Sequence, residues 1–422
     1  MKKFVLALVF GVTAAGVGAP ADAEPRSGGV RVWNELALNA VRATRATDAD
    51  AARTYAMLNV AVYDAVNGLA RPARTSALVP GPGPHGADAR AAAVAAAHAV
   101  LVRLDPGRAD AYDVQLRTDL DRLPAGGHRD AGEQWGREVG RRVVVSRADD
   151  GSTPVQSQPA GTGPGVFRAE WSGVQYRDVR PFAVSNPSAH VPGPPPALGS
   201  LDYAAAFAEV ALLGDAALPA PDKLATFQFW SVPTGTNQPA GEWVKIALTV
   251  SRDRSLADSA RLLALLTMAL ADSTVPTVAT KFTYRHWRPA TAIREADTDG
   301  NPSTQPNPSW TPRAGGIGGT PEYPSGHSSY SGAAAAVLAR FFCADNIRFA
   351  HTTDTAPDGQ ARTYPGFSAA AVEAGRSRVF GGQHFEFSDQ AGLAIGRGIA
   401  SEVLATRLLK RTGPTHHGEC PL

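Results

Sequence analysis

Three short groups of residues between Lys281 and Asp389 carry side chains that are suited to holding an oxyanion. Lys281 is followed after six residues by Arg288-Pro289, Pro324-Ser325-Gly326-His327 comes next, and Ser377-Arg378 is followed after five residues by His384. Together they offer one ammonium, two guanidiniums, a hydroxyl, a glycine amide and two imidazoles. These donors suit a tetrahedral anion with three acidic oxygens and one open apical position. We therefore expect this stretch to bind such an anion and to carry out chemistry on it.

The first group lies at the end of the most apolar helical run, residues 256–285. A helix that is apolar nearly all round is buried. We expect residues 273–276 to interrupt it, and Pro289 to end the segment because proline restricts the residue before it. Lys281 and Arg288 are seven residues apart, so a continuous helix would direct both from one face. Buried cations would need an anionic partner; two solvated surface charges are the alternative.

The second group, Pro324-Ser325-Gly326-His327, precedes a helix of small residues expected at 328–342. Ser325 is suited to cap this helix, which makes the Gly326 amide one of the unpaired donors at its N-terminus. Such a terminus attracts anions, and His327 in the first turn could act on them as a general acid or base. A capped helix with an incidental histidine explains this tetrapeptide equally well when it is taken alone.

The third group presents Arg378 and His384 on either side of a sharp Gly381-Gly382 turn, between a helix end at 373–380 and a helix beginning near Ser388. Arg378 can offer an oxyanion a planar fork of donors. His384 can serve as a metal ligand or as a nucleophile. Asp389 or Glu386 is the expected partner that orients its second ring nitrogen.

The N-terminus predicts export. Lys2-Lys3 precedes an apolar stretch at 4–17, and Ala21-Asp22-Ala23 forms an A-x-A cleavage site before Glu24. A membrane anchor is the weaker alternative, since glycines and a proline interrupt the short apolar run. No later segment is expected to span a membrane. The cysteines, Cys343 and Cys420, could form one disulfide or remain two free thiols.

The remaining chain predicts an all-α protein. Its 422 residues, 44% hydrophobic, can bury a sizeable core, and a net charge of +2 without a basic run gives no support for nucleic-acid binding. Apolar residues recur at helical spacing, whereas residues 149–200 are rich in proline and glycine and predict a long irregular excursion. Helices are expected at 32–69, 87–104, 109–123, 132–146, 203–213, 222–230 and 243–252.

The pattern K-x6-R-P, P-S-G-H and S-R-x5-H resembles the superfamily of vanadium-dependent haloperoxidases and type-2 phosphatidic acid phosphatases. The likeness is nearest to exported bacterial haloperoxidase-like proteins and covers essentially the whole mature chain. It is carried by KFTYRHWRPATAIR, EYPSGHSSYSGAAAAVLARFF, EAGRSRVFGGQHF, WNELALNAVRATR and VPTGTNQPAGEWVKIA. The resemblance implies two packed helix bundles. After a signal peptide at 1–23 we expect a single domain at 24–422, with N-terminal helices at 30–255 and the oxyanion-site half at 256–410.

The resemblance also implies roles for individual residues. His384 would bind vanadium directly, or act as the nucleophile if the anion is phosphate, and His327 would be the acid or base near the apical oxygen. The remaining oxyanion-binding groups would be Lys281, Arg288 and Arg378 at the equatorial oxygens, with Ser325 and the Gly326 amide adding hydrogen bonds. With vanadate as cofactor, the enzyme would use hydrogen peroxide to oxidise bromide or chloride to hypohalous acid, which would halogenate a small organic acceptor.

Two positions depart from the family pattern. Ser388 stands where an aspartate commonly follows the last histidine by four residues, and Asp389 comes one residue later. Thr320, seven residues before His327, is neither aromatic nor histidine at a position that helps to shape the halide pocket in relatives. Trp287, beside Arg288, is a further candidate for the pocket wall.

Three functions are therefore compared. The first is an exported vanadate-dependent haloperoxidase, and the second is a soluble exported acid phosphatase that uses the same pocket with His384 as nucleophile. The third is a non-enzymatic helical protein that only sequesters an oxyanion. Halogenation with vanadate, hydrolysis of an aryl phosphate and the effect of His327→Ala would discriminate among them.

Overall fold

The computed structural model of the protein describes residues 29–71 and 73–411. The expected signal peptide and its cleavage site lie outside the described residues, as does Cys420. Cys343 is disulfide-bonded, and Cys420, the partner expected for it, is not among the described residues.

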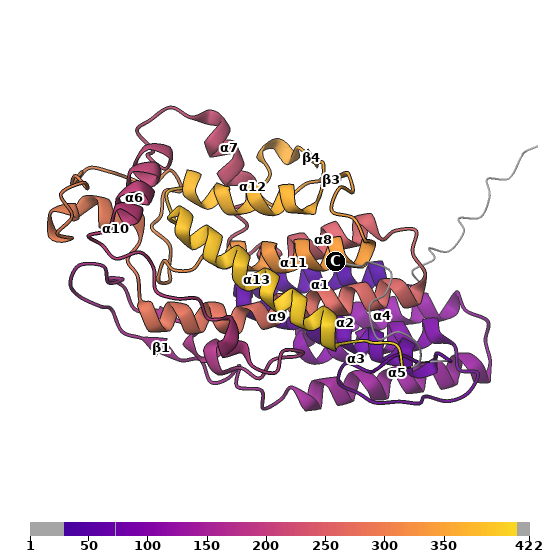
Figure 1. Cartoon of the computed structure of the whole chain (residues 1–422). Coiled ribbons are helices and arrows are strands. Elements are labelled where there is room, and N and C mark those ends of the chain that lie inside the picture. Colours follow the sequence, from indigo (N-terminus) through magenta and orange to yellow (C-terminus); the bar gives the residue numbers. More distant parts are fainter. Residues whose placement is uncertain (1–28, 72, 412–422) are drawn as a thin grey trace, which may run out of the picture.

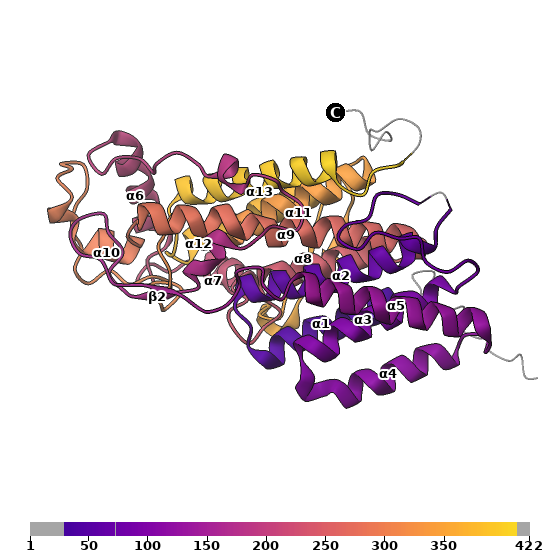
Figure 2. The same ribbon diagram turned by 90° about the horizontal axis from the view of Figure 1, so that it is seen from below.

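The described residues form two packed groups of helices, which confirms the all-α prediction (Figure 1). The turned view shows them as layers, in which α9 (Leu256–Tyr284) of the second group and α8 (Gln238–Val250) face the first group, with α6 (Leu201–Leu213) and α10 (Pro289–Arg294) at one end (Figure 2). The first group comprises α1 (Val30–Thr44), α2 (Asp48–Leu69), α3 (Ala89–Leu104), α4 (Ala109–Asp121) and α5 (Gly127–Ser146). The second comprises α9 (Leu256–Tyr284), α11 (Gly326–Phe342), α12 (Phe367–Phe380) and α13 (Glu386–Thr406).

Four shorter helices and two small sheets complete the fold. The helices are α6 (Leu201–Leu213), α7 (Pro221–Phe229), α8 (Gln238–Val250) and α10 (Pro289–Arg294). Antiparallel pairs join β1 (Ser157–Gln158) to β2 (Trp171–Ser172) and β3 (Phe349–His351) to β4 (Arg362–Tyr364). One cluster of buried apolar side chains runs from α1–α5 through α8 and α9 into α11–α13, so the two helix groups share a continuous core.

Helix α9 runs unbroken through Pro276, so the expected interruption at 273–276 is wrong. Proline removes one backbone donor and crowds the preceding turn. Threonine hydroxyls add bonds to neighbouring carbonyls, from Thr277 to Ser273 at 2.8 Å and from Thr280 to Pro276 at 2.6 Å, but neither replaces the lost bond. Burial on nearly all faces outweighs the remaining cost, as the apolar composition predicted.

By length and composition α9 is also the one helix of the described residues that could cross a membrane. From the sequence, no segment after the N-terminus was expected to be able to span a membrane. However, 89% of its most apolar 18-residue window is buried inside the protein, as in the core helix of a globular domain. Its apolar surface is therefore explained by packing against α2, α11 and α13.

The C-terminal end of α9 differs from the expectation that Lys281 and Arg288 share one helix face. The helix ends at Tyr284, and Arg285 adopts a left-handed conformation with φ 48°. Arg288 therefore caps the N-terminus of α10, after an irregular link. The two cations still reach one place, because an irregular link with a left-handed Arg285 replaces the continuous helix.

The irregular segment 149–200 is held against the core by a buried carboxylate of α9. Asp272 accepts the backbone N–H groups of Phe182, Ala183 and Val184 at 2.6, 2.7 and 2.9 Å. Further along, the carbonyl of Arg285 accepts the N–H of Phe167 at 2.7 Å. The predicted excursion is thus fixed to α9 at the helix centre and again beyond its end.

Glycines allow α11 and α13 to approach closely where the site begins. A Cβ at Gly392 would lie 2.4 Å from the Ser325 carbonyl oxygen, and one at Gly396 would lie 2.2 Å from that of Ser329. Both distances are far below contact, so only glycine permits this packing. The Ser325 N–H donates to the Ser388 carbonyl at 3.0 Å, which fixes the start of α11 against the start of α13.

We predict that Asp272→Asn lowers the free energy of unfolding by about 2–4 kcal/mol, because an amide nitrogen would face backbone donors and leave at least one of them unpaired. Urea unfolding measures this change. Asp253→Asn, which alters an exposed acid just before α9, serves as the control and should change stability little. Equal stability of the two variants would show that the carboxylate does not hold the 149–200 segment.

Candidate active site

The three sequence groups converge at one end of the second helix group. Lys281 comes from the last turn of α9 and Arg288 from the start of α10. The N-terminus of α11 supplies Ser325, Gly326 and His327, whereas Arg378 ends α12 and His384 lies in the turn before α13. Lys281, Arg288, Ser325, Arg378 and His384 are all buried.

Glu322 is the residue that orients His384. Its Oε1 lies 3.0 Å from Nδ1 of His384 and accepts the Phe385 N–H at 2.9 Å. Its Oε2 accepts the Ser388 hydroxyl at 2.6 Å, and Nδ1 of His286 lies 3.4 Å away. The Glu322 side chain is fully buried. Burial would raise the pKa of this carboxyl, but His286 and His384 outweigh that effect and hold it well below its usual range.

This contact fixes the proton on His384. An ionised carboxylate only accepts, so Nδ1 carries the hydrogen and Nε2 keeps its lone pair. Burial, and next the charge of Arg288, lower the pKa of His384 to about 3, which keeps the ring neutral. Nη1 of Arg288 lies 3.0 Å from Nε2. The lone pair of His384 therefore faces the cationic side chains.

The cations of the site are strongly desolvated. Burial lowers the pKa of Lys281 well below its usual value, with the charge of Arg288 adding to the effect. Burial likewise lowers the pKa of Arg288 to about 10 and that of Arg378 to about 9. Both arginines remain charged at neutral pH. Lys281 donates to the carbonyls of Pro321 and Glu322, so backbone dipoles help to hold its ammonium.

Arg378 has donors that the protein does not satisfy. Its Nη2 donates to the Gln383 side-chain oxygen, but Nε and Nη1 have no hydrogen-bond partner among the described residues, although the side chain is buried. An unpaired buried guanidinium nitrogen is costly. An oxyanion would supply the missing acceptors, so the donor set fits such a group.

The start of α11 adds neutral donors. Ser325 caps the helix as predicted, with Oγ accepting the Ser328 N–H at 3.4 Å and the Ser328 hydroxyl at 2.8 Å. Its own hydroxyl hydrogen is then free to donate. Gly326 is the first helical residue, so its N–H has no acceptor within the helix.

His327 is half-buried at the same helix end. Its Nε2 lies 3.3 Å from the carbonyl of Ser231, which can only accept, so Nε2 carries the hydrogen. Burial, and then the charge of Arg378, lower the pKa of His327 well below its usual value. The ring is therefore neutral, with Nδ1 available to accept a proton.

Neither Asp389 nor Glu386 orients His384, so that expectation is wrong. Glu386 pairs with Arg376 instead. Asp389 is buried, and neither of its carboxyl oxygens has a hydrogen-bond partner among the described residues. The missed residue, Glu322, stands at the start of the EYPSGH stretch, where an acid directly before apolar and small residues was the available signal.

The two remaining candidates for the pocket differ in position. Thr320 contacts the site through Arg288, whose Nε donates to the Thr320 carbonyl at 2.8 Å and whose Nη2 donates to its hydroxyl at 3.3 Å. Trp287 is fully buried, donates to the Tyr203 hydroxyl at 3.2 Å and belongs to an apolar cluster. It packs in the core of that cluster.

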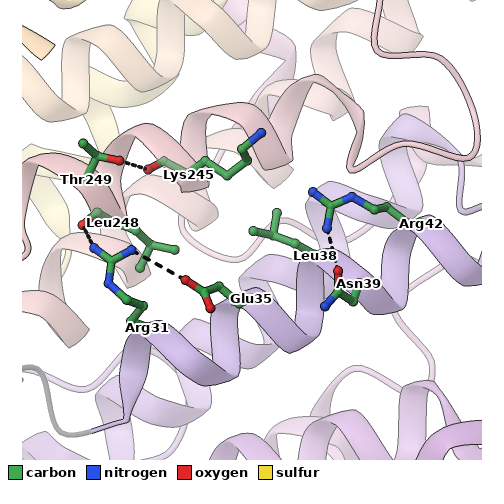
Figure 3. A pocket seen from close by; sticks show the side chains of 8 residues that line it. All are labelled: Arg31, Glu35, Leu38, Asn39, Arg42, Lys245, Leu248 and Thr249. Atoms are coloured by element: carbon green, nitrogen blue, oxygen red, sulfur yellow. Dashed lines mark hydrogen bonds and ion pairs between the residues drawn. The ribbon is translucent and has the colours of Figure 1, made fainter. Parts of the chain in front are cut away.

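A cavity of about 380 Å³ lies elsewhere, between α1 and α8 (Figure 3). Its floor is Leu38 and Leu248. Each cation at its edge already has an acidic partner: Arg31 pairs with Glu35 at 3.6 Å, Arg42 with Asp354 at 2.6 Å and Lys245 with Glu242 at 2.9 Å. This cavity therefore lacks the unpaired donors of the oxyanion site.

Comparison with known proteins finds a family model that matches the part of the chain that holds the site. Residues 261–410 match the family described as the VCPO second helical-bundle domain, and this range contains all three sequence groups. The oxyanion-site half of the chain is therefore similar to that domain. A search of curated protein sequences found no significant match.

Solved vanadium haloperoxidase structures show that the same fold extends along most of the chain. A bacterial vanadium-dependent iodoperoxidase superposes with a TM-score of 0.76 at 22% identity, covering 90% of this chain and 97% of that chain. A holo-type bacterial vanadium-dependent chloroperoxidase gives a TM-score of 0.60 at 16% identity, covering 85% of this chain and 92% of that chain. At these identities the likeness concerns the fold.

We predict that Glu322→Gln weakens orthovanadate binding roughly 10- to 100-fold, the usual effect of changing a group that supports a metal ligand. Glutamine keeps the shape but makes Nδ1 a weaker donor and His384 a weaker base. Inorganic phosphate, held by charge alone, should bind no more weakly than before. Isothermal titration measures both affinities, and Asp389→Asn is the control that should retain vanadate. Equal losses for both anions would refute a role through His384.

We also predict that Asp389→Asn changes the pH dependence of stability. Burial raises the pKa of Asp389 from 3.8 to about 7, so the folded protein binds this proton more tightly than the unfolded chain. The resulting stability, on the order of 4 kcal/mol, is complete below pH 4 and is lost as the pH rises through 7. Above pH 7, Asp389→Asn should therefore unfold at a higher temperature, relative to the wild type, than it does at low pH. Asp202→Asn, at an exposed first-turn acid of α6, should show no such gain.

Proposed function

We propose that the protein is a vanadate-dependent haloperoxidase that uses hydrogen peroxide to oxidise halide, bromide or chloride, to hypohalous acid. The observation that carries this proposal is the Nε2 lone pair of His384, held by Glu322 and directed among desolvated cations. A neutral imidazole supported by a carboxylate is a typical metal ligand. The fold shared with vanadium-dependent iodo- and chloroperoxidases supports the same conclusion.

Vanadate is the cofactor we propose for this site. His384 Nε2 would bind vanadium, whereas Arg288 and the unpaired donors of Arg378 would neutralise its oxygens. Lys281, Ser325 and Gly326 would complete the set of donors. Bound vanadate supplies a Lewis acid that activates peroxide without a change of oxidation state. The protein contributes fixed positive charge in a buried place, where electrostatic stabilisation is strongest.

His327 is the proposed proton acceptor. Because Nε2 donates to the Ser231 carbonyl, Nδ1 is the free nitrogen of a neutral ring. It can accept the proton that hydrogen peroxide releases and can return it to the leaving water. Peroxide chemistry begins with this proton transfer, which a neutral ring can accept.

The test is a paired assay on the purified protein. With orthovanadate, peroxide and bromide, we expect halogenation of a phenolic acceptor, absent without vanadate and reduced at least 100-fold in His384→Ala and His327→Ala. Hydrolysis of an aryl phosphate, inhibited by vanadate, would instead support the phosphatase. Tight vanadate binding with neither activity would support an oxyanion-binding protein and would overturn the proposal.

A further inference from the structure

The backbone of Gly326 borders open space. Its φ lies outside the left-handed region, and a Cβ there would meet only Oδ2 of Asp48, at an ordinary contact distance of 3.7 Å. The protein's own packing would thus accept a larger residue at this position, unlike the glycines between α11 and α13. This open space adjoins the free helix-terminal amide and offers a path by which an anion could reach the site.

Asp48 forms one wall of this path. It is the first residue of α2, and its Oδ1 accepts the Ala49 N–H at 2.9 Å. Its Oδ2 has no hydrogen-bond partner among the described residues. Asp48 is exposed, and yet burial in the surrounding protein raises the pKa of its carboxyl. A side chain can be exposed to solvent and still have its pKa raised by the surrounding protein when it lines a recess.

The charged and titratable groups that face Asp48 are few. Lys281 faces it from α9, Tyr330 from α11 and Asp50 from its own helix. Asp50 is already engaged by the Thr47 and Tyr176 hydroxyls. Asp48 is therefore the carboxylate with a free oxygen beside the path, close to cations that attract anions from solution.

We propose that Asp48 is a specificity-determining residue, whose carboxylate repels anionic substrates at the mouth of the site while neutral hydrogen peroxide passes unaffected. The inference deepens the proposed function, because it concerns access to the same pocket. The substrate class it controls is a small anion, a halide in the haloperoxidase or a phosphomonoester in the alternative. Like charges at short range in a partly solvated recess impose such a barrier, which salt weakens.

Binding of inorganic phosphate to the full-length protein tests the charge effect without any catalysis. At low ionic strength we expect Asp48→Asn to lower the phosphate Kd roughly tenfold, an interaction between the limits for water and for a partly buried pair. Asp48→Glu should keep the wild-type Kd. Asp110→Asn removes an exposed acid from the first turn of α4 and is the matched control. An unchanged Kd in Asp48→Asn, or an equal change in Asp110→Asn, would overturn the proposal.

Steady-state kinetics of the vanadate-loaded protein then separate the two substrates. The KM for bromide should fall by a similar factor in Asp48→Asn, whereas the KM for hydrogen peroxide and kcat should stay within twofold of the wild type. An equal shift in both KM values would refute selection by charge. If no halogenation occurs but the phosphate Kd values still separate as expected, the proposed function fails and the role of Asp48 stands.

Discussion

Burial of Glu322 among cations and imidazoles is the interaction on which the site depends. Lys281, Arg288 and Arg378 are all buried, and buried charge is tolerated only when it is paired or hydrogen-bonded. Glu322 supplies negative charge inside the cluster, and its two oxygens are used in full by His384, Phe385 and Ser388. One carboxylate cannot balance the two charged arginines, so the cluster carries excess positive charge. This excess positive charge favours the binding of an oxyanion.

The fold makes this cluster possible through the packing of α11 against α13. The glycines of α13 let the two helix starts meet, and the bond from Ser325 to Ser388 locks them together. Ser388 in turn donates to Glu322, which holds His384. The cap of one helix, the first turn of the next and the orientation of the imidazole are thus a single connected arrangement. A shift of either helix would therefore move the donors at the start of α11 and the imidazole of His384 together.

The sequence allowed much of this to be predicted where the determinants are local. Helical periodicity located the helices, Ser325 was identified as a cap, and three motifs marked the residues that converge. The failures involve tertiary context. Pro276 continues within α9 because packing on nearly all faces outweighs its local cost. Lys281 and Arg288 meet through an irregular link at Arg285, which helical spacing could not show.

The hydrogen-bond partner of His384 shows most clearly what could not be predicted from the sequence. Asp389 and Glu386 were favoured because they are close in sequence, yet Glu322, 62 residues away, makes the contact. A residue on α13 projects according to the helical period, and burial of Asp389 against Gly375 of α12 uses its side chain elsewhere. Glu322 instead approaches from an irregular segment, where direction is set by tertiary contacts. An orienting residue for a ligand that lies in a turn is therefore to be sought among all acids of the converging segments, and its distance in sequence carries little weight.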